Sequence, residues 1–271
     1  MFVINKIFIK IWYFFRKYHR KKFINYFKKN GVYNYIHNVN KKGLEIRYLQ
    51  AGFLHKLIKK KKFRQIIEFG SGWTTIVIAH ALSTLDNETG DNLCKLYVIE
   101  SDIEWAEETK KNIPKHLTKY VEFIIEQPII KNKNFRNYLE YKNLPNKNID
   151  LVFVDGPNEK DAKGNINGIE NSVINQNAII NILNYENDSK KTWYLVEQRI
   201  GCVEFLIKNL RYSYQIYYYF QNYHFLFKPV KTNFRLIEKN GFNIFNLKQT
   251  INKNLFGKKK IKTYFYRLLN F

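Results

Sequence analysis

Short apolar runs alternate with segments of helical periodicity through the middle of this 271-residue chain. The runs have the length of β-strands, and the segments between them repeat apolar residues every three or four positions. Such alternation predicts parallel strands joined by crossover helices that cover both faces of one sheet. The expected strands are 63–69, 95–99, 121–125, 149–154 and 192–196, and the expected helices are 73–82, 102–112, 134–142, 169–183 and 203–209.

A strand pair of a different kind follows the last of these helices. Residues 213–220 and 223–227 are both strand-like, and only Gln221 and Asn222 separate them. A connection of two residues cannot hold a crossover helix, so these two strands should be antiparallel. We therefore expect an α/β fold with a doubly wound, mostly parallel seven-stranded sheet that ends in an antiparallel pair. Residues 31–62 are expected to form a helical lead-in, and residues 83–92 and 158–167 the longest loops.

The first expected strand ends in a glycine turn, Glu68-Phe69-Gly70-Ser71-Gly72-Trp73-Thr74-Thr75. Gly70 and Gly72 can adopt positive φ and bring the backbone close to a ligand. The helix that begins behind them offers unpaired N–H groups and the positive end of its dipole. This arrangement suits a nucleotide-like cofactor, but the dinucleotide fingerprint requires a third glycine where Thr75 stands. The turn therefore argues against NAD and FAD.

Acidic residues stand at the carboxyl ends of four expected strands: Glu68, Glu100, Asp155 and Glu197. In a doubly wound sheet the carboxyl ends of the strands meet along one crevice, where ligands bind. A carboxylate at the end of the second strand can accept hydrogen bonds from both hydroxyls of a ribose. Glu100 therefore favours a cofactor that contains adenosine.

Three segments together resemble the successive motifs of class I S-adenosylmethionine-dependent methyltransferases. They are residues 68–75, residues 98–102 (Val-Ile-Glu-Ser-Asp) and residues 152–157 (Val-Phe-Val-Asp-Gly-Pro). The resemblance extends over residues 45–230, and the final antiparallel strand pair also fits that family's seven-stranded sheet. It implies a Rossmann-like methyltransferase fold that uses S-adenosylmethionine.

The resemblance also implies a role for particular residues. Glu68, Gly70 and Gly72 would surround the methionine part of the cofactor, with Trp73 placed to cover it. Glu100 would bind the ribose, Glu126 or Gln127 would lie near the adenine, and Asp155 would lie beside the transferred methyl group. The implied cofactor-binding residues are Glu68, Gly70, Ser71, Gly72, Trp73, Thr74, Glu100, Ser101, Glu126, Gln127 and Asp155.

A narrower resemblance is to methyltransferases encoded with bacterial surface-polysaccharide genes and, more distantly, to glucuronoxylan O-methyltransferases. It is carried by residues 150–157 and by Leu-Val-Glu-Gln-Arg at 195–199 with Val-Glu-Phe-Leu at 203–206. Such relatives have an Asp-Gly-Arg turn after the fifth strand, where this chain has Glu197-Gln198-Arg199 and lacks the glycine. The implied reaction is O-methylation of a glycan or a surface-polysaccharide precursor.

Methyl transfer to a hydroxyl requires alignment of the acceptor and removal of its proton by a base or a metal. Asp155 is the first candidate for this catalytic role and Glu197 the second, while Arg199 suits a carboxylate or phosphate on the acceptor. The alternatives are a turn-forming Asp155 before Gly-Pro and a local ion pair between Glu197 and Arg199. No spacing of His, Asp and Glu matches a metal-binding motif, although two carboxylates in one crevice leave a divalent cation open.

Lys and Arg concentrate at the two ends of the chain. Of a net charge of +23, residues 1–30 contribute nine Lys/Arg without an acid, and residues 228–271 contribute eleven against one Glu. We expect a basic amphipathic helical extension at 1–44, a methyltransferase domain at 45–230 and a basic extension at 231–271. Ends of this kind favour an anionic partner, and we expect a membrane surface ahead of nucleic acid.

The N-terminal segment repeats apolar residues at helical spacing, with Ile4, Phe8, Ile11, Trp12 and Phe15 on one side. That side suits an interfacial helix on a membrane, and it equally suits packing on the domain with the lysine side solvated. No uncharged stretch of about 18 residues is present that would span a bilayer. The pattern leaves both interpretations open.

The two cysteines, Cys94 and Cys202, lie far apart in the sequence. They form neither a disulfide framework nor a zinc-ligand cluster, which is typical of a reducing compartment. We expect a cytoplasmic protein whose basic ends favour the inner face of the membrane.

Two other functions remain open from the sequence. The first is a nucleic-acid methyltransferase, which the charge and the aromatic content favour. Against it, Asp155-Gly156-Pro157-Asn158 is not the Asn/Asp-Pro-Pro-Tyr/Phe run of enzymes that methylate base amino groups. The second is a membrane-associated binding protein with a vestigial cofactor pocket, which the retention of both turn glycines and Glu100 disfavours.

Overall fold

The structure is a computed structural model that describes most of the chain between residues 17 and 229. The expected basic extension at 231–271, the first sixteen residues, the Gln221-Asn222 turn and Gln198 lie outside the described residues. The described residues are 17–39, 46–90, 93–133, 136–157, 165–166, 169–170, 179–186, 192–197, 199–212, 214–219 and 224–229.

Seven strands form one sheet in the order β10-β11-β9-β6-β1-β2-β3. All neighbours in it are parallel except β11, which runs antiparallel to both β9 and β10. The sheet is the doubly wound, mostly parallel sheet with a terminal antiparallel pair that the sequence predicts, and it has a Rossmann-like methyltransferase fold. Its strands are β1 Gln65–Phe69, β2 Lys95–Glu100, β3 Val121–Ile125, β6 Leu151–Val154, β9 Trp193–Glu197, β10 Tyr214–Tyr219 and β11 His224–Pro229.

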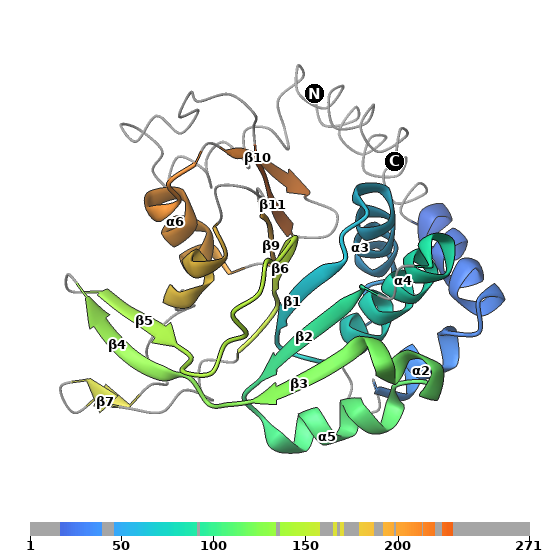
Figure 1. Cartoon of the computed structure of the whole chain (residues 1–271), viewed down its shortest axis with the longest axis horizontal. Coiled ribbons are helices and arrows are strands. Elements are labelled where there is room, and N and C mark those ends of the chain that lie inside the picture. The colour runs from blue at the N-terminus through green and yellow to red at the C-terminus, as the bar shows by residue number, and fades with distance from the viewer. Residues whose placement is uncertain are drawn as a thin grey trace, which may run out of the picture.

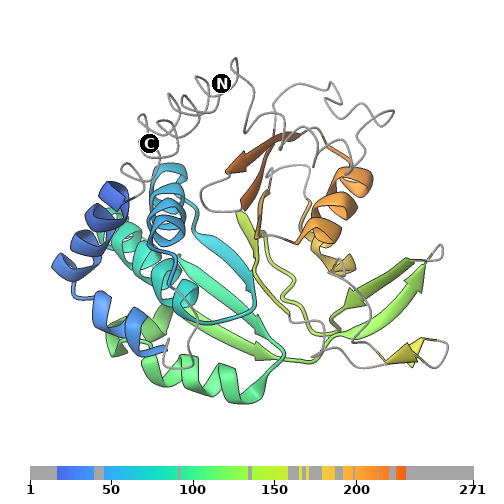
Figure 2. The same ribbon diagram turned by 180° about the vertical axis from the view of Figure 1, so that it is seen from behind.

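Helices cover both faces of this sheet, as Figures 1 and 2 show. Helices α3 (Tyr48–Lys61) and α4 (Trp73–Thr89) lie on one face, and α6 (Ile200–Asn209) with the 3-10 helix η5 (Ile180–Tyr185) lies on the other. Successive side chains of a strand point to opposite faces, so Ile66 belongs to the first core cluster and Ile67 to the second. Burial on both sides explains why the central strands read as continuous apolar runs.

The chain changes direction between β1 and β6. From β1 it proceeds through β2 to β3 at one edge, and it then returns to place β6 on the other side of β1. Ligands bind at such a switch point, outside the carboxyl ends of the strands. The fold therefore directs attention to the residues that follow β1, β2 and β6.

Helix α4 is longer than the sequence predicts. The polar residues 83–89, expected in a loop, continue the helix to Thr89, and it ends at Gly90 with φ +72°. Asp86 is buried there and accepts a hydrogen bond from the Tyr120 hydroxyl at 3.1 Å, at the end of the 3-10 helix η2 (Lys115–Tyr120). The sequence alone predicts a loop here because it does not show that Asp86 has a buried hydrogen-bond partner.

Helix α5 (Ile103–Asn112) begins as expected. The Asp102 side chain caps it by accepting a hydrogen bond from the Trp105 backbone N–H at 2.9 Å. Ala106 and Thr109 are its buried residues.

The helix expected at 134–142 is wrong. Strands β4 (Ile129–Lys133) and β5 (Arg136–Glu140) form an antiparallel hairpin instead. Ile130 pairs with Leu139 across this hairpin, and both side chains pack on the second core cluster. The pairing with the preceding segment, and not the periodicity of 134–142 itself, decides the structure.

The helix expected at 169–183 is also wrong in the parts that the structure describes. Residues Ile169–Glu170 form strand β8, paired with β7 (Asn165–Ile166), and residues 180–185 form η5; residues 171–178 lie outside the described part. The segment is rich in asparagine, which disfavours helix interiors.

The helical lead-in is confirmed. Residues 17–29 are helical, followed by α2 (Tyr33–Val39) and α3. Phe27 is fully buried, and the Phe23 ring lies against Gly52 of α3, so this stretch of the N-terminal segment packs on the domain. Within the described residues, none of the helices is long and apolar enough to cross a membrane.

Candidate functional site

The glycine turn after β1 packs directly against the turn after β6. Gly70 has φ +92°, and a Cβ added to it would lie 2.8 Å from the backbone nitrogen of Gly156. The Gly70 N–H also donates to the Ile99 carbonyl of β2 at 2.8 Å. Only glycine fits this close approach, and it brings the ends of β1, β2 and β6 together.

Glu68 connects the end of β1 to the first turn of α4 and so stabilises the glycine turn between them. Its carboxyl group is fully buried and accepts hydrogen bonds from the hydroxyls of Thr74 and Thr75 at the start of α4. The Thr75 hydroxyl in turn accepts the Gly72 N–H at 3.1 Å. Burial raises the pKa of Glu68 to about 8, and the charges of Asp155 and Glu100 add to the rise.

Glu100 connects the end of β2 to the glycine turn, as the sequence predicts. Its Oε1 accepts the backbone N–H groups of Ser101 and Asp102, at 2.7 and 3.1 Å, and its Oε2 accepts the Ser71 hydroxyl at 2.7 Å. The side chain is almost fully buried, and this burial raises its pKa. The Ser101 hydroxyl lies 3.2 Å from the hydroxyl of Tyr141.

Two tryptophans lie near the turn, and the sequence pointed to only one. Trp73 belongs to the first core cluster beside α3 and α4. Trp105 of α5 donates its indole N–H to the Ser71 carbonyl at 2.8 Å, and its ring would be 3.4 Å from a Cβ on Gly72. The sequence contained a signal for this contact. Asp102 caps α5 directly after β2, and this places Trp105 in the first turn of α5, next to the carboxyl end of β2.

Glu126 follows β3 and lies next to Glu100, whose carbonyl accepts the Glu126 backbone N–H at 2.9 Å. The carboxylate of Glu126 accepts the backbone N–H groups of Lys142 and Asn143, at 2.7 and 2.9 Å. Gln127 is exposed. The Glu126 carboxylate therefore holds the chain after β5 in place, at the edge where an adenine was expected.

Asp155 follows β6 between Gly70 and the end of β9. Its backbone N–H donates to the Phe69 carbonyl at 3.0 Å, while its carboxylate has no hydrogen-bond partner among the described residues. Burial raises the pKa of Asp155, and the charges of Arg199 and Arg47 oppose that rise. Within the described part of the chain, Asp155 is therefore the acid after a strand whose carboxylate accepts no hydrogen bond.

Arg199 holds the turn after β6. Its guanidinium donates to the carbonyls of Pro157 and Asp155, both at 2.6 Å. The local ion pair considered for Glu197 and Arg199 is not found; Glu197 pairs with other residues.

Glu197 belongs to a polar cluster that we call the Glu197 network, made of Arg47, Gln50, Glu197 and His224. One carboxylate oxygen pairs with the Arg47 guanidinium, and the other accepts the Gln50 side-chain N–H. Gln50 Nε2 lies 3.0 Å from His224 Nε2, which must accept because the amide donates. Burial lowers the pKa of His224 to about 3, so the imidazole is neutral.

Sequence reasoning missed Arg47 and Gln50. They precede Glu197 by 150 and 147 residues, and nothing local marks them as its partners. The Arg47 side chain is 41% exposed and that of Glu197 only 9%.

We expect Arg47→Ala to lower the free energy of unfolding by about 2 kcal/mol, because it leaves a buried carboxylate without its cation. Adding Glu197→Gln to Arg47→Ala should restore part of the loss, since the amide carries no charge. Urea denaturation of the three proteins measures this. Lys208→Ala, which removes a surface pair with Glu204, is the control; an equal loss there would show that the buried pair has no special weight.

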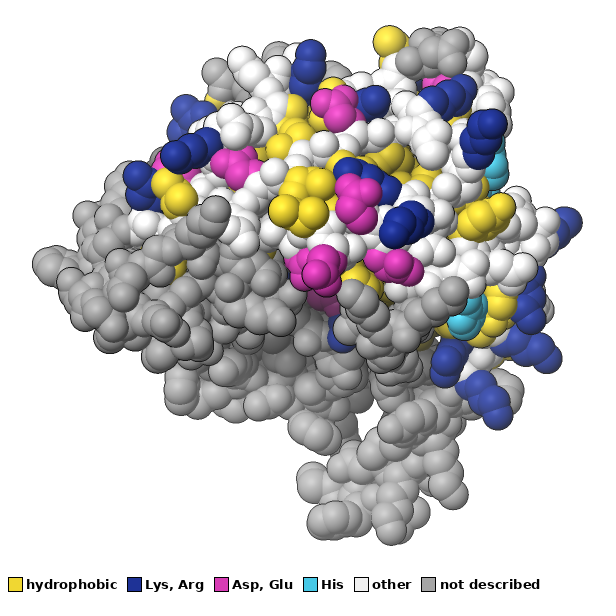
Figure 3. Space-filling view, turned by 90° about the horizontal axis from the view of Figure 1, so that it is seen from below, with side chains coloured by type: hydrophobic (Ala, Val, Ile, Leu, Met, Phe, Trp, Pro, Cys, Tyr) yellow, Lys and Arg dark blue, Asp and Glu magenta, His cyan; other side chains and the backbone are white. Residues whose placement is uncertain are grey.

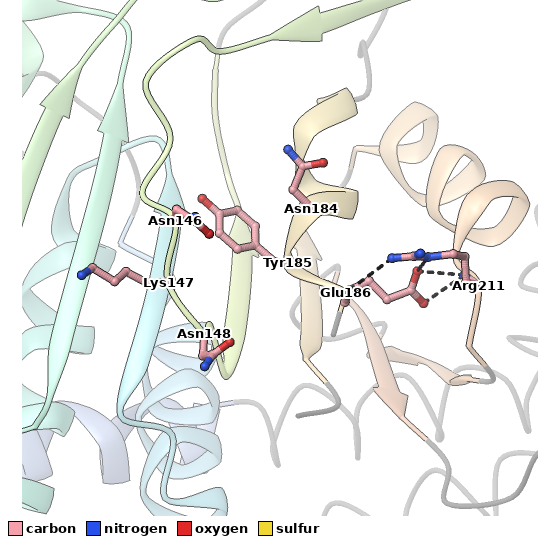
Figure 4. Close-up of a pocket in the computed structure, with 7 residues that line it drawn as sticks. All are labelled: Asn146, Lys147, Asn148, Asn184, Tyr185, Glu186 and Arg211. Atoms are coloured by element: carbon pink, nitrogen blue, oxygen red, sulfur yellow. Dashed lines mark hydrogen bonds and ion pairs between the residues drawn. The ribbon is translucent and has the colours of Figure 1, made fainter. Parts of the chain in front are cut away.

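No group of three or more His, Cys, Asp or Glu side chains is placed to hold a metal ion within the described residues. A polar pocket of about 290 Å³ lies elsewhere, beside the segments that lead into β6, β9 and β10 at the opposite edge of the sheet (Figure 4). In it, Glu186 accepts the backbone N–H groups of Arg211 and Tyr212. Its lining residues are Asn146, Lys147, Asn148, Asn184, Tyr185, Glu186 and Arg211, and it shares none of them with the candidate site.

No protein-family model matches the chain, and no curated protein matches it. Solved structures with a similar outline include a putative O-methyltransferase from Klebsiella pneumoniae, at 14% identity and TM-score 0.45, covering 73% of this chain and 87% of that one. An O-methyltransferase from Bacillus cereus in complex with SAH has 17% identity and TM-score 0.42, over 70% of this chain and 84% of that one. A putative caffeoyl-CoA O-methyltransferase from Staphylococcus aureus has 13% identity and TM-score 0.43, over 83% and 99%. The assignment of a function rests on the sheet order and on the geometry of the site itself.

Proposed function

We propose that the protein is an S-adenosylmethionine-dependent methyltransferase that binds its cofactor over the carboxyl ends of β1, β2 and β6. The observation that carries the proposal is the bond between Ser71 of the glycine turn and Glu100 at the end of β2, at 2.7 Å. Oε2 of Glu100 accepts only this bond among the described residues and keeps a lone pair for a ribose hydroxyl. The Ser71 oxygen can accept a second hydroxyl.

The charges of the site also suit this cofactor. When bound, it supplies a methyl group on a positively charged sulfonium. Burial raises the pKa of Glu68, and the charges of Asp155 and Glu100 add to that rise, so both of these carboxyl groups act on the region above Glu68. A cation bound beside Asp155 and Glu100 would interact favourably with their charges. Gly70 packs directly against Gly156, so no side chain covers the backbone of the two turns where they meet.

We propose Asp155 as the group that orients the acceptor hydroxyl and takes its proton. Its carboxylate accepts no hydrogen bond from the described residues, and burial raises its pKa, which makes it a stronger base, while the charges of Arg199 and Arg47 oppose that rise. Glu197, the second candidate, has both oxygens engaged by Arg47 and Gln50, so its part would be to hold those side chains in position.

For the acceptor we propose a hydroxyl of a glycan or surface-polysaccharide precursor. This part rests on the resemblance of residues 150–157 and 195–206 to methyltransferases of polysaccharide gene clusters. A cytoplasmic location agrees with Cys94 and Cys202, which are both buried and form no disulfide.

Calorimetric titration with S-adenosylmethionine and with its demethylated product tests the proposal. We expect the wild-type protein to bind both, and Glu100→Ala to weaken binding at least tenfold, which is about 1.4 kcal/mol. Glu122→Ala, which removes an exposed carboxylate from the neighbouring strand β3, is the matched control and should bind normally. Absence of binding by folded wild-type protein would sink the methyltransferase proposal.

A further inference from the structure

One side of the molecule carries a dense group of cations, which we call the basic surface. It is formed by the helix at residues 17–29 and by α3 with the residue that follows it. These two segments contain no Asp or Glu. The basic surface consists of Lys17, Arg20, Lys21, Lys22, Lys28, Lys29, Lys56, Lys59, Lys60, Lys61 and Lys62.

Packing of apolar side chains holds the two segments together. The Phe23 ring lies against Gly52 of α3, and the Lys56 ammonium lies 5.2 Å from the centre of the same ring. Phe27 is fully buried and Ile24 half-buried in the first core cluster. The apolar side of the helix therefore faces the domain, and its lysines are fixed on the outside of a folded layer.

The cations of the two segments repel one another. Burial, followed by the charge of Lys22, lowers the pKa of Lys56, and burial with Lys22 and Lys56 lowers the pKa of His19. Glu88 of α4 pairs with Lys59 of this group at 2.9 Å. Figure 3 shows one face of the molecule, on which Lys and Arg gather at the lower right and side chains of both signs mix over the centre. Such a surface gains stability when an anion covers it.

The neighbouring chain indicates what kind of anion this is. Twelve of the sixteen residues that precede the helix are apolar or aromatic, Trp12 among them. Tyr18, at the beginning of the described helix, is 58% exposed. Basic side chains next to apolar and aromatic ones suit the headgroup region of a bilayer, whereas a nucleic-acid backbone needs only the charge.

We propose that the basic surface binds the anionic headgroups of a lipid membrane. The cations supply the attraction to the headgroups. The inference concerns a different part of the molecule from the proposed cofactor site and stands independently of it.

Flotation with vesicles tests the proposal on the full-length chain. We expect binding to vesicles with 30% phosphatidylglycerol, none to pure phosphatidylcholine, and loss of binding at high salt, where charges are screened. The variant Lys21→Glu/Lys22→Glu/Lys60→Glu should bind at least 100-fold more weakly, since each lysine near an anionic surface contributes roughly fivefold. The variant Lys115→Glu/Lys142→Glu/Lys147→Glu makes the same change of net charge on other exposed positions and should bind as the wild type does.

Three results would overturn the proposal. Equal loss in both triple variants would mean that only net charge matters, and unchanged binding in the first would place the contact elsewhere. Tight binding of a 20-base-pair DNA or RNA duplex with no binding to vesicles would assign the basic surface to nucleic acid. Circular dichroism of each variant separates these results from a failure to fold.

Discussion

Replacement of Gly70 by alanine should lower the free energy of unfolding by about 4 kcal/mol and abolish cofactor binding. A side chain at φ +92° is itself strained, at a cost of about 1–2 kcal/mol. The larger part comes from the added Cβ, which would lie 2.8 Å from the nitrogen and 3.0 Å from the Cα of Gly156. These are backbone atoms of the turn after β6, and they cannot rotate away as the end of a side chain would.

Gly90→Ala separates the two contributions to this loss. Gly90 also has positive φ, at +72°, but a Cβ there would meet no atom within 4 Å among the described residues. Its replacement should therefore cost only the backbone strain, about 1 kcal/mol. Urea denaturation of both variants gives the comparison. If Gly70→Ala loses no more stability than Gly90→Ala, the two turns do not pack as closely as the structure has them.

The sheet could be predicted because its strands carry their own signal. A strand buried on both faces is a largely apolar run, and β1, β2, β6 and β9 have this form, whereas the edge strand β3 contains the exposed Glu122. Acids that end such strands must then share one edge. The position of Glu100 beside the glycine turn follows from that rule, whereas its hydrogen bond with Ser71 was not predicted.

Other parts of the site depend on contacts that no local pattern contains. Glu197 was expected to face a ligand or Arg199. Instead, its carboxylate is bound by Arg47 and Gln50, which precede it by 150 and 147 residues in the sequence. Glu68 was expected to lie against the methionine part of a cofactor, yet its oxygens accept hydrogen bonds from Thr74 and Thr75. The sequence thus identified the acids at the carboxyl ends of the strands, but their hydrogen-bond partners could be identified only from the three-dimensional structure.

The four acids at the carboxyl ends of the strands therefore have different roles. Glu68 and Glu197 are engaged by neighbouring side chains and hold the turn and the lead-in helix in place. Glu100 is partly engaged, and the Asp155 carboxylate accepts no hydrogen bond from the described residues. An activity assay should accordingly be more sensitive to Asp155 than to Glu197 at equal stability.

A pair of buried histidines makes the packing of the lead-in helices sensitive to acid. His55 of α3 and His80 of α4 lie with Nε2 and Nδ1 3.0 Å apart, and the Tyr26 hydroxyl lies 3.4 Å from the same His55 nitrogen. Burial, with the charge of the partner, lowers the pKa of His55 to about 3. Burial, with the charge of His116, lowers the pKa of His80 to about 4. Both rings are therefore neutral in the folded protein down to acid pH.

The sign of the resulting pH dependence follows from the direction of these shifts. In the unfolded chain each histidine takes up a proton near pH 6.5, whereas in the folded chain it does so only near pH 3 or 4. Between these values the unfolded state binds more protons, so the free energy of unfolding falls as the pH falls. The raised pKa of Glu68 acts in the opposite direction over pH 4.5 to 8, which partly masks the effect in the wild-type protein.

Comparison of the wild type with His55→Leu/His80→Leu removes this masking, because Glu68 is present in both. We expect the wild type to lose about 4 kcal/mol relative to the double variant between pH 7 and pH 5, roughly 2 kcal/mol for each histidine. Urea denaturation at the two pH values measures the difference. A difference that stays constant with pH would show that the two rings are not buried as neutral groups, and the packing of residues 17–29 on α3 and α4 would then need another explanation.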